Sequence, residues 1–473
     1  MLPIIADALG LKRDGTGMRI GLPGLVLVAL ALGSPVCAAS APPPPRPCLP
    51  PGLPQPAPAP RQLPIDVYFD GSQSMSGFAE PGPSAVRPLG DLLRLLADQG
   101  APVRYHAFGK AIADLTPARA ALYDRPQVYN CKACDNQESW IDDVLRAVAR
   151  APADRLSIVV TDLWLDNHAF HGSLQVAFGG PLAKLIVPAP GAAAVPALAV
   201  LGIRAPYRGR IYDLPGGGSP RFDGERPLFV LIAGPEREVA ALRAMLRDSH
   251  SPAFNADHLR EAVFTAGGTA RLATPPVPVG GGVTTAGPLA GAADVAHYRF
   301  DRALAARQRG AIAGRYAPGL AVTPGEVWRG PPAAASRVWV MGDAGALARC
   351  APGAWRALPP LRGSWRVGGP GAGGNGSGAF RFDATNSAAM SAGEAYLVAG
   401  SIGTAALATP NPDTQWLRDW SLPADASGFA ASRPRLFKTL GLADLATLME
   451  ADMTRATPRG RALLGFQFAV SVE

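Results

Sequence analysis

The sequence predicts an α/β fold, with a doubly wound, mostly parallel sheet over residues 65–248 and a second, mainly β domain over residues 251–473. Two observations predict it. In the first part, short apolar runs of strand length alternate with segments whose apolar residues recur at helical spacing, which is typical of a parallel sheet covered on both faces. In the second part, Gly, Ala and Pro are dense and the strand-like runs are short. The 54 Gly and 49 Pro residues also exclude a long helical bundle or coiled coil.

The elements of the first part follow from local patterns. Continuous apolar, β-branched runs indicate strands buried on both faces, and apolar residues three and four apart indicate helices. In chain order, the expected elements are a strand at Ile65–Phe69, a helix at Pro88–Gln99, a strand at Val103–Phe108, a helix at Trp140–Ala149, a strand at Leu156–Val160, a helix at Leu174–Ile186, strands at Ala197–Ile203 and Pro227–Ile232, and a helix at Glu236–Leu246. Gly and Pro within Tyr207–Glu225 predict an inserted hairpin or loop between the last two strands.

The elements of the second part are short and separated by loop-like sequence. Residues 369–378 are nearly all small and are expected to form a loop. The expected elements are strands at Val295–Phe300, Arg337–Met341, Ala379–Phe382, Glu394–Ala399 and Phe466–Val472, with one helix at Leu442–Met453.

Composition narrows the classes of function. Hydrophobic residues make up 48% of the 473 positions, which is enough for sizeable cores and excludes wholesale disorder. The 45 Lys and Arg against 37 Asp and Glu give a net charge of +8, but no basic block stands out. Nucleic-acid binding is therefore not expected. The spread positive charge suits contact with acidic partners or an anionic envelope surface.

The N-terminal 40 residues are expected to be a secretory signal peptide, with Met18 as an alternative start. Arg19 supplies the positive region, Leu25–Leu32 the apolar core, and small residues follow it. The apolar stretch is shorter than the roughly 20 residues of a membrane span, although an uncleaved anchor is an alternative, as is a lipid anchor on Cys37. We expect a periplasmic or secreted protein without a transmembrane span in the mature chain.

A Pro-rich stretch at residues 41–64 is typical of a stiff, solvated linker. After loss of Cys37, an even number of cysteines fits an oxidising compartment. Among them, Cys131 and Cys134 form a CxxC, for which a local disulfide is the favoured interpretation. Zinc binding by a lone CxxC and a redox-active thiol pair are the alternatives.

The sequence Asp70-Gly-Ser72-Gln-Ser74 follows the first predicted strand. The carboxyl ends of strands are where open parallel sheets bind ligands. One carboxylate and two hydroxyls on alternate residues of a tight loop supply oxygen ligands for a small hard cation such as Mg²⁺, which takes about six of them. A plain turn stabilised by local Asp and Ser hydrogen bonds is the alternative interpretation.

Two further residues are candidates for the same site. Asp162 ends another predicted buried strand, at the matching edge of the sheet. Ser139 precedes the predicted helix Trp140–Ala149, where its hydroxyl could close the site or cap the helix.

With these motifs, residues 63–248 resemble the von Willebrand factor A (vWA) domain, on the sequences DGSQSM and VVTD in this order. The resemblance implies a metal-ion-dependent adhesion site on a doubly wound sheet. Asp70, Ser72 and Ser74 would form its first loop, Ser139 would take the position usually held by threonine, and Asp162 would supply the third loop. The implied ion is Mg²⁺, with Mn²⁺ or Ca²⁺ as alternatives.

The sequence departs from the family pattern at two places. Gln137-Glu138 replaces the glycine-rich approach to the threonine position, and Leu163 replaces the glycine that often follows the last Asp. Asp135, Glu138 and Asp166 are therefore alternative ligands.

The expected function is metal-dependent protein binding in adhesion or assembly. The two negative charges of the carboxylates only neutralise the charge of a divalent cation. An open coordination position on the ion would therefore accept a carboxylate from an Asp or Glu of a partner protein. No catalytic residue is assigned. The alternative is a Mg²⁺-dependent hydrolase or phosphatase of the envelope, since an Asp at a strand end also serves as a nucleophile. A thiol-based or purely structural protein, in which the CxxC dominates, is a third interpretation.

Overall fold

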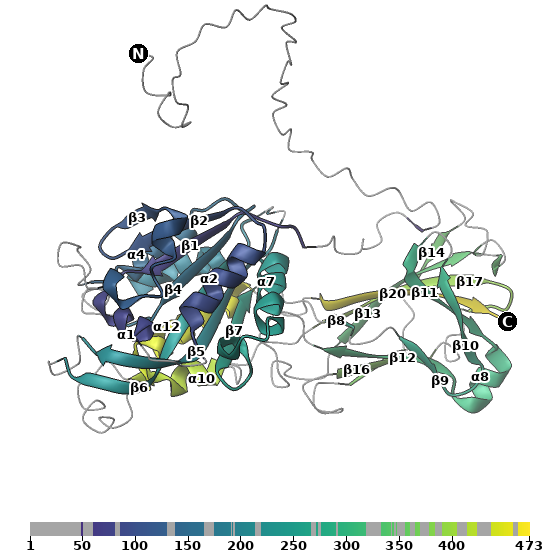
Figure 1. Ribbon diagram of the computed structural model, residues 1–473. Helices are drawn as coiled ribbons and strands as arrows, with labels where there is room; N and C mark the ends of the chain where they lie inside the picture. Colours follow the sequence, from purple (N-terminus) through teal and green to yellow (C-terminus); the bar gives the residue numbers. More distant parts are fainter. Residues whose placement is uncertain are drawn as a thin grey trace, which may run out of the picture. The chain divides into compact units, whose positions relative to one another are not determined.

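The fold is described from a computed structural model (Figure 1). It describes residues 49–50, 60–80, 86–129, 138–164, 175–190, 192, 194–212, 219–265, 271–272, 276–289, 292–317, 333–341, 343–344, 347, 355–359, 365–368, 378–383, 390–403, 414–422, 437–456 and 462–473. The expected signal peptide, most of the Pro-rich linker and all five cysteines lie outside these residues. Within them, no helix has the length and apolar character needed to cross a membrane.

A seven-stranded sheet forms the centre of an α/β body. In spatial order its strands are β3 (Ile112–Leu115), β2 (Val103–Phe108), β1 (Ile65–Asp70), β4 (Leu156–Thr161), β6 (Arg221–Pro235), β5 (Pro196–Arg210) and β7 (Leu259–Thr265). Every residue of β1 and of β4 is buried, because helices cover both faces of these two strands (Figure 1). The α/β class expected from the sequence is confirmed.

The strand directions divide the sheet into two parts. β1 pairs in parallel with both β2 and β4. β3, β6, β5 and β7 each pair antiparallel with their neighbours. Within the segment 207–225, β5 continues to Arg210 and β6 begins at Arg221, and the two strands pair antiparallel there. In the sheet, β6 lies between β4 and β5.

Helices on the two faces bury apolar stripes against this sheet. The helices between β1 and β7 are α1 (Ser76–Ala79), α2 (Pro88–Asp98), α3 (Pro117–Ala120), α4 (Ile141–Val148), α6 (Gly180–Ile186) and α7 (Glu236–Asp248). In α2, Leu89, Leu92 and Leu96 are buried at a spacing of three and four residues, as the sequence pattern predicts. Asp91 in its first turn carries the favourable sign of charge for a helix N-terminus.

Segments from the C-terminal half complete the α/β body. β7 forms one edge of the sheet, and α10 (Gln415–Asp419) and α12 (Leu442–Ala456) bury apolar side chains in the same core. Leu445 and Met449 of α12 belong to the core cluster that contains β1 and β4. The body defined by this core is therefore wider than residues 65–248.

The remaining described residues form a mainly β region, as expected. One sheet has the order β10 (Val283–Leu289), β11 (Ala292–Phe300), β20 (Ala462–Val472), β17 (Ala395–Gly403), β13 (Ala333–Met341) and β14 (Arg356–Leu358). A second sheet has the order β15 (Trp365–Gly368), β16 (Gly378–Phe382), β12 (Ala311–Ala317) and β8 (Arg271–Leu272), with β9 (Val277–Val279) also paired to β12, and α8 (Arg302–Gln308) lies between β11 and β12 in the chain. The two sheets share one core, in which Phe382 of β16 contacts Phe468 of β20 edge to face.

Candidate metal centre

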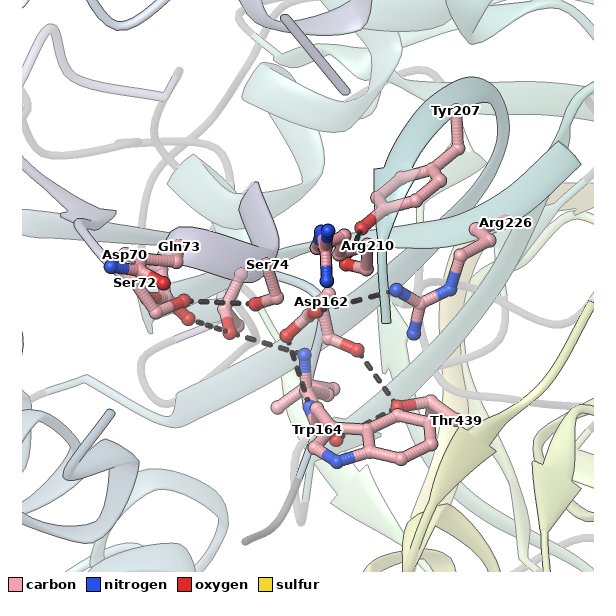
Figure 2. A network of polar contacts seen from close by, with 12 residues as sticks. Asp70, Ser72, Gln73, Ser74, Asp162, Trp164, Tyr207, Arg210, Arg226 and Thr439 are labelled. Carbon is pink, nitrogen blue, oxygen red and sulfur yellow. Dashed lines mark hydrogen bonds and ion pairs between the residues drawn. The ribbon is translucent and has the colours of Figure 1, made fainter. Parts of the chain in front are cut away.

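The candidate centre lies where two neighbouring parallel strands end. Phe69 of β1 is paired with Val160 of β4, so Asp70 and Asp162 follow at the same edge of the sheet. Asp70 has no exposed surface and Asp162 is 2% exposed. Carboxylates with so little solvent need charge or hydrogen-bond partners. Figure 2 shows both aspartates with the residues around them.

Asp70 is held by three hydrogen bonds from different segments. The backbone N–H of Ser72 and the hydroxyl of Ser139 donate to Oδ1, at 2.9 Å and 2.6 Å. The hydroxyl of Thr161 donates to Oδ2 at 2.7 Å. Thr161 belongs to the VVTD sequence, but the sequence pattern does not single it out as a site residue. Its hydroxyl also accepts a hydrogen bond from the N–H of Leu163 at 3.1 Å, and so it links the two aspartate loops.

The first loop presents two hydroxyls in addition to Asp70. After Asp70 the chain turns into a short 3₁₀ segment, Gln73–Met75, anchored by the buried side chain of Met75. This turn brings Ser72 Oγ and Ser74 Oγ to 3.0 Å from each other (Figure 2). Hydroxyl oxygens at this separation can serve as neighbouring ligands of one small cation.

Ser139 reaches the site from the segment before α4. Trp140 is the N-cap residue of this helix, and the Ser139 hydroxyl donates to Asp70, so the Ser139 side chain bonds across loops. Glu138, which the sequence offers as a ligand, accepts from the indole N–H of Trp140 at 3.1 Å and lies 3.8 Å from Lys110. Asp135 and Asp166, which the sequence offers in the same way, lie outside the described residues, as do the cysteines of the CxxC.

The Asp162 loop has an unusual backbone. Leu163 has φ +47°, in the left-handed region that favours glycine, while its side chain is buried. Leucine therefore keeps the backbone conformation that a glycine would adopt freely. Asp162 Oδ1 accepts from the N–H of Trp164 at 3.2 Å. Asp162 Oδ2 is buried and accepts no hydrogen bond from any described residue.

A residue far along the chain fixes this loop. Thr439, in the short strand β19 (Thr439–Leu440), has no exposed surface. Its hydroxyl lies 2.9 Å from the carbonyl oxygen of Asp162 and 3.0 Å from that of Leu163. Its single O–H group lies within hydrogen-bond distance of both carbonyl oxygens and so anchors the loop. Nothing in the local sequence marks Thr439 as a residue of this site.

A buried arginine also faces Asp162. Arg226 of β6 is 1% exposed, and its Nη1 lies 3.9 Å from Asp162 Oδ2 (Figure 2). Its guanidinium carbon lies 5.3 Å from the ring centroid of Trp164 and 4.8 Å from that of Tyr207. In the sequence, Arg226 is marked only as a charged residue next to the apolar run 227–232.

The two aspartates interact electrostatically. Burial, and then the negative charge of Asp162, raise the pKa of Asp70 to about 6, against the lowering effect of its hydrogen bonds from Ser139, Ser72 and Thr161. The charge of Asp162 disfavours the ionised form of Asp70, and a cation between the two carboxylates would relieve this.

The surface beside Ser139 is hollowed. A cavity of about 290 Å³ is lined by Gly109, Lys110, Ala111, Ile112, Trp140, Asp143, Val144 and Arg150. Trp140 joins it to the site, because its N–H donates to the carbonyl of Gly109 at 3.1 Å and Ser139 precedes it.

The donor set fits a hard divalent cation. The described residues contain no group of three or more His, Cys, Asp and Glu side chains suited to a metal. The site instead combines two carboxylates with three serine hydroxyls, which is oxygen chemistry suited to Mg²⁺, and it holds a buried carboxylate oxygen with unused acceptor capacity. No known protein family, curated protein or solved structure matches this chain.

Proposed function

We propose that this protein is a metal-dependent protein-binding module of the vWA type. Asp70, Ser72, Ser74, Ser139 and Asp162 would hold Mg²⁺, or Mn²⁺ or Ca²⁺ in its place. The ion supplies a coordination position that accepts a carboxylate from an Asp or Glu of a partner protein. The sequence pattern of residues 1–40 supports an exported location, periplasmic or secreted.

One observation supports this proposal most strongly. Asp70 and Asp162 extend from adjacent strands, and the charge of one raises the pKa of the other. Asp162 keeps a buried oxygen without a hydrogen bond from the described residues. Both burial and repulsion of the carboxylates destabilise the folded state, and a cation bound between them would relieve this cost.

The charge of the site supports binding over catalysis. The two carboxylates balance a divalent ion, and the hydroxyls add no charge, so the ion keeps its affinity for an external carboxylate. The hydrolase alternative needs an Asp whose oxygen can attack a substrate. Both oxygens of Asp70 already accept hydrogen bonds and the side chain is fully buried, which makes it a poor nucleophile toward a substrate.

Calorimetric titration with Mg²⁺ tests the metal site. Wild type should bind one ion, and Asp70→Ala and Ser74→Ala should lose or strongly weaken the binding. Ser76→Ala is the matched control, since Ser76 lies in the same turn and donates to the carbonyl of Gln73. It should bind Mg²⁺ as wild type does.

Capture of partners from an envelope extract tests the binding function. The immobilised wild-type chain should retain a protein with Mg²⁺ present and release it when a chelator is added. Asp70→Ala should retain none of it. If Asp70→Ala keeps both its Mg²⁺ affinity and its partner, the proposed function is wrong.

A further inference from the structure

Arg226 occupies an unusual place beside the candidate metal centre. It lies in β6, three residues before Phe229, which is paired with Thr161 at the end of β4. Arg226 therefore lies just beyond the end of β4, level with the Asp162 loop. The rings of Trp164 and Tyr207 enclose the guanidinium, which leaves the side chain 1% exposed. A buried arginine is rare and needs a partner for its charge.

The partner that the described residues provide is the carboxylate oxygen the metal would use. Arg226 Nη1 lies 3.9 Å from Asp162 Oδ2, which is beyond hydrogen-bond distance. Asp162 Oδ2, Arg226 Nη1 and Arg226 Nε are all buried, and none has a hydrogen bond within the described part of the chain. Asp162 Oδ2 and Arg226 Nη1 therefore interact through charge and not through a hydrogen bond.

The Arg226 guanidinium and a divalent metal ion would therefore compete for the same buried carboxylate of Asp162. A divalent ion that contacts Asp162 would be close to the positive charge of Arg226. Like charges repel strongly where solvent screening is weak, so the guanidinium and the metal ion oppose each other's binding. In the absence of metal, the same guanidinium compensates the charge of Asp162 and stabilises the loop.

We propose that Arg226 is an internal competitor of the metal ion at Asp162. This inference rests on the proposed metal site. Arg226 stabilises the metal-free state and lowers the affinity for Mg²⁺. The negative charge of a partner carboxylate then offsets the repulsion, so metal and partner bind cooperatively, each raising the affinity of the other.

Mg²⁺ titration of charge variants tests the competition, with dissociation constants from calorimetry. Arg226→Met and Arg226→Gln remove the charge and should tighten Mg²⁺ binding roughly tenfold or more, because a nearby buried charge no longer repels the ion. Arg226→Lys keeps the charge and should bind Mg²⁺ much as wild type does.

A second measurement is thermal unfolding with Mg²⁺ and with a chelator. Without metal, Arg226→Met should unfold at a lower temperature than wild type, and Mg²⁺ should raise its unfolding temperature by more.

Each result has a defined meaning. If Arg226→Met and Arg226→Gln bind Mg²⁺ no tighter than wild type, the competition is refuted and the metal site stands. If neither wild type nor any variant binds Mg²⁺, the proposed metal site itself is refuted. If the variants bind Mg²⁺ and wild type does not, the competition is supported, and the proposed metal-dependent function of wild type is refuted.

Variants that fail to fold remain informative. They would be refolded in Mg²⁺ and, in parallel, in a sodium salt of equal ionic strength. A higher yield of folded protein in Mg²⁺ supports replacement of the guanidinium by the ion. Equal yields in the two salts refute it.

Discussion

At the scale of single residues, the candidate site contains two kinds of residue. Some are marked by the local sequence, and others come from distant segments of the chain. Asp70, Ser72 and Asp162 were predictable because each follows a strand whose apolar pattern is clear. Arg226 and Thr439 were not, because their importance comes only from which residues surround them in the fold. Thr161 was visible in the sequence but looked like the last residue of a strand.

Thr439 yields a prediction about the Asp162 loop. Thr439→Val keeps the shape of the side chain and removes the donor that lies near the carbonyls of Asp162 and Leu163. We expect a loss of about 1–3 kcal/mol of unfolding free energy, because buried carbonyls lose their partner. Denaturant unfolding measures this, and Thr439→Ser, which keeps the hydroxyl, should stay closer to wild type. Equal stability of the Val and Ser variants would contradict the role of the hydroxyl.

Asp70 yields a prediction about pH. Its pKa is raised from 3.8 to about 6 in the folded protein, so the folded state binds the proton more tightly than the unfolded chain does. In chelator, stability should therefore decrease as pH rises from about 4 to about 6, by about 2–3 kcal/mol.

Denaturant unfolding over this pH range checks the effect. Asp70→Asn cannot titrate and should show a flatter dependence than wild type. An identical slope in the two proteins would assign the pH dependence to other groups.

At the scale of elements, the sequence predicted where strands and helices lie better than how they pair. β1, β2, β4 and α2 fall close to their expected ranges. The position of β6 between β4 and β5 was not predictable, since a strand buried on both faces has the same apolar pattern beside a parallel or an antiparallel neighbour. Gly and Pro within 207–225 predicted an inserted hairpin or loop, and within this segment β5 continues to Arg210 and β6 begins at Arg221.

The contact of α10 with β5 yields a prediction at this scale. A Cβ on Gly202 of β5 would lie 2.6 Å from Trp416 and 2.7 Å from Trp420, whereas a Cβ on Gly180 of α6 meets nothing within 4 Å. Gly202→Ala should therefore lower the unfolding free energy by about 1–3 kcal/mol through overpacking. Gly180→Ala is the matched control and should be neutral or slightly stabilising. Thermal unfolding of both variants measures this, and similar unfolding temperatures would argue against close packing of α10 on β5.

At the scale of the whole molecule, the α/β class and the mainly β second region were predictable from composition and periodicity. The packing of a C-terminal segment against the core of the α/β body was not predictable from the sequence. The segment Leu442–Met453 was expected as a helix, but an apolar helical stripe does not identify the surface that it covers. In the structure this stripe packs into the core that surrounds β1 and β4.

This packing predicts that a fragment ending at residue 248 is not a stable domain. Such a fragment lacks β7 and α12 and exposes the core surface that Leu445 and Met449 cover. We expect it to be degraded much faster by protease than the full chain and to unfold without a cooperative transition. Limited proteolysis and thermal unfolding followed by circular dichroism measure this.

A point variant separates core packing from chain length. Met449→Ala in the full chain should cost about 2–5 kcal/mol, since the side chain is 3% exposed. A fragment that unfolds as cooperatively as the full chain, together with a neutral Met449→Ala, would show that α12 contributes little to the body.

The contact of the Thr439 hydroxyl with the Asp162 loop joins segments that are made at different times during synthesis. A chain is made from its N-terminus, so both aspartates emerge long before the hydroxyl that fixes the backbone between β4 and Trp164. Until that hydroxyl is made, the Asp162 loop has only its contacts with residues nearer in the chain, such as Thr161. The backbone of the Asp162 loop therefore reaches its final set of contacts only after the segment that contains Thr439 has been made.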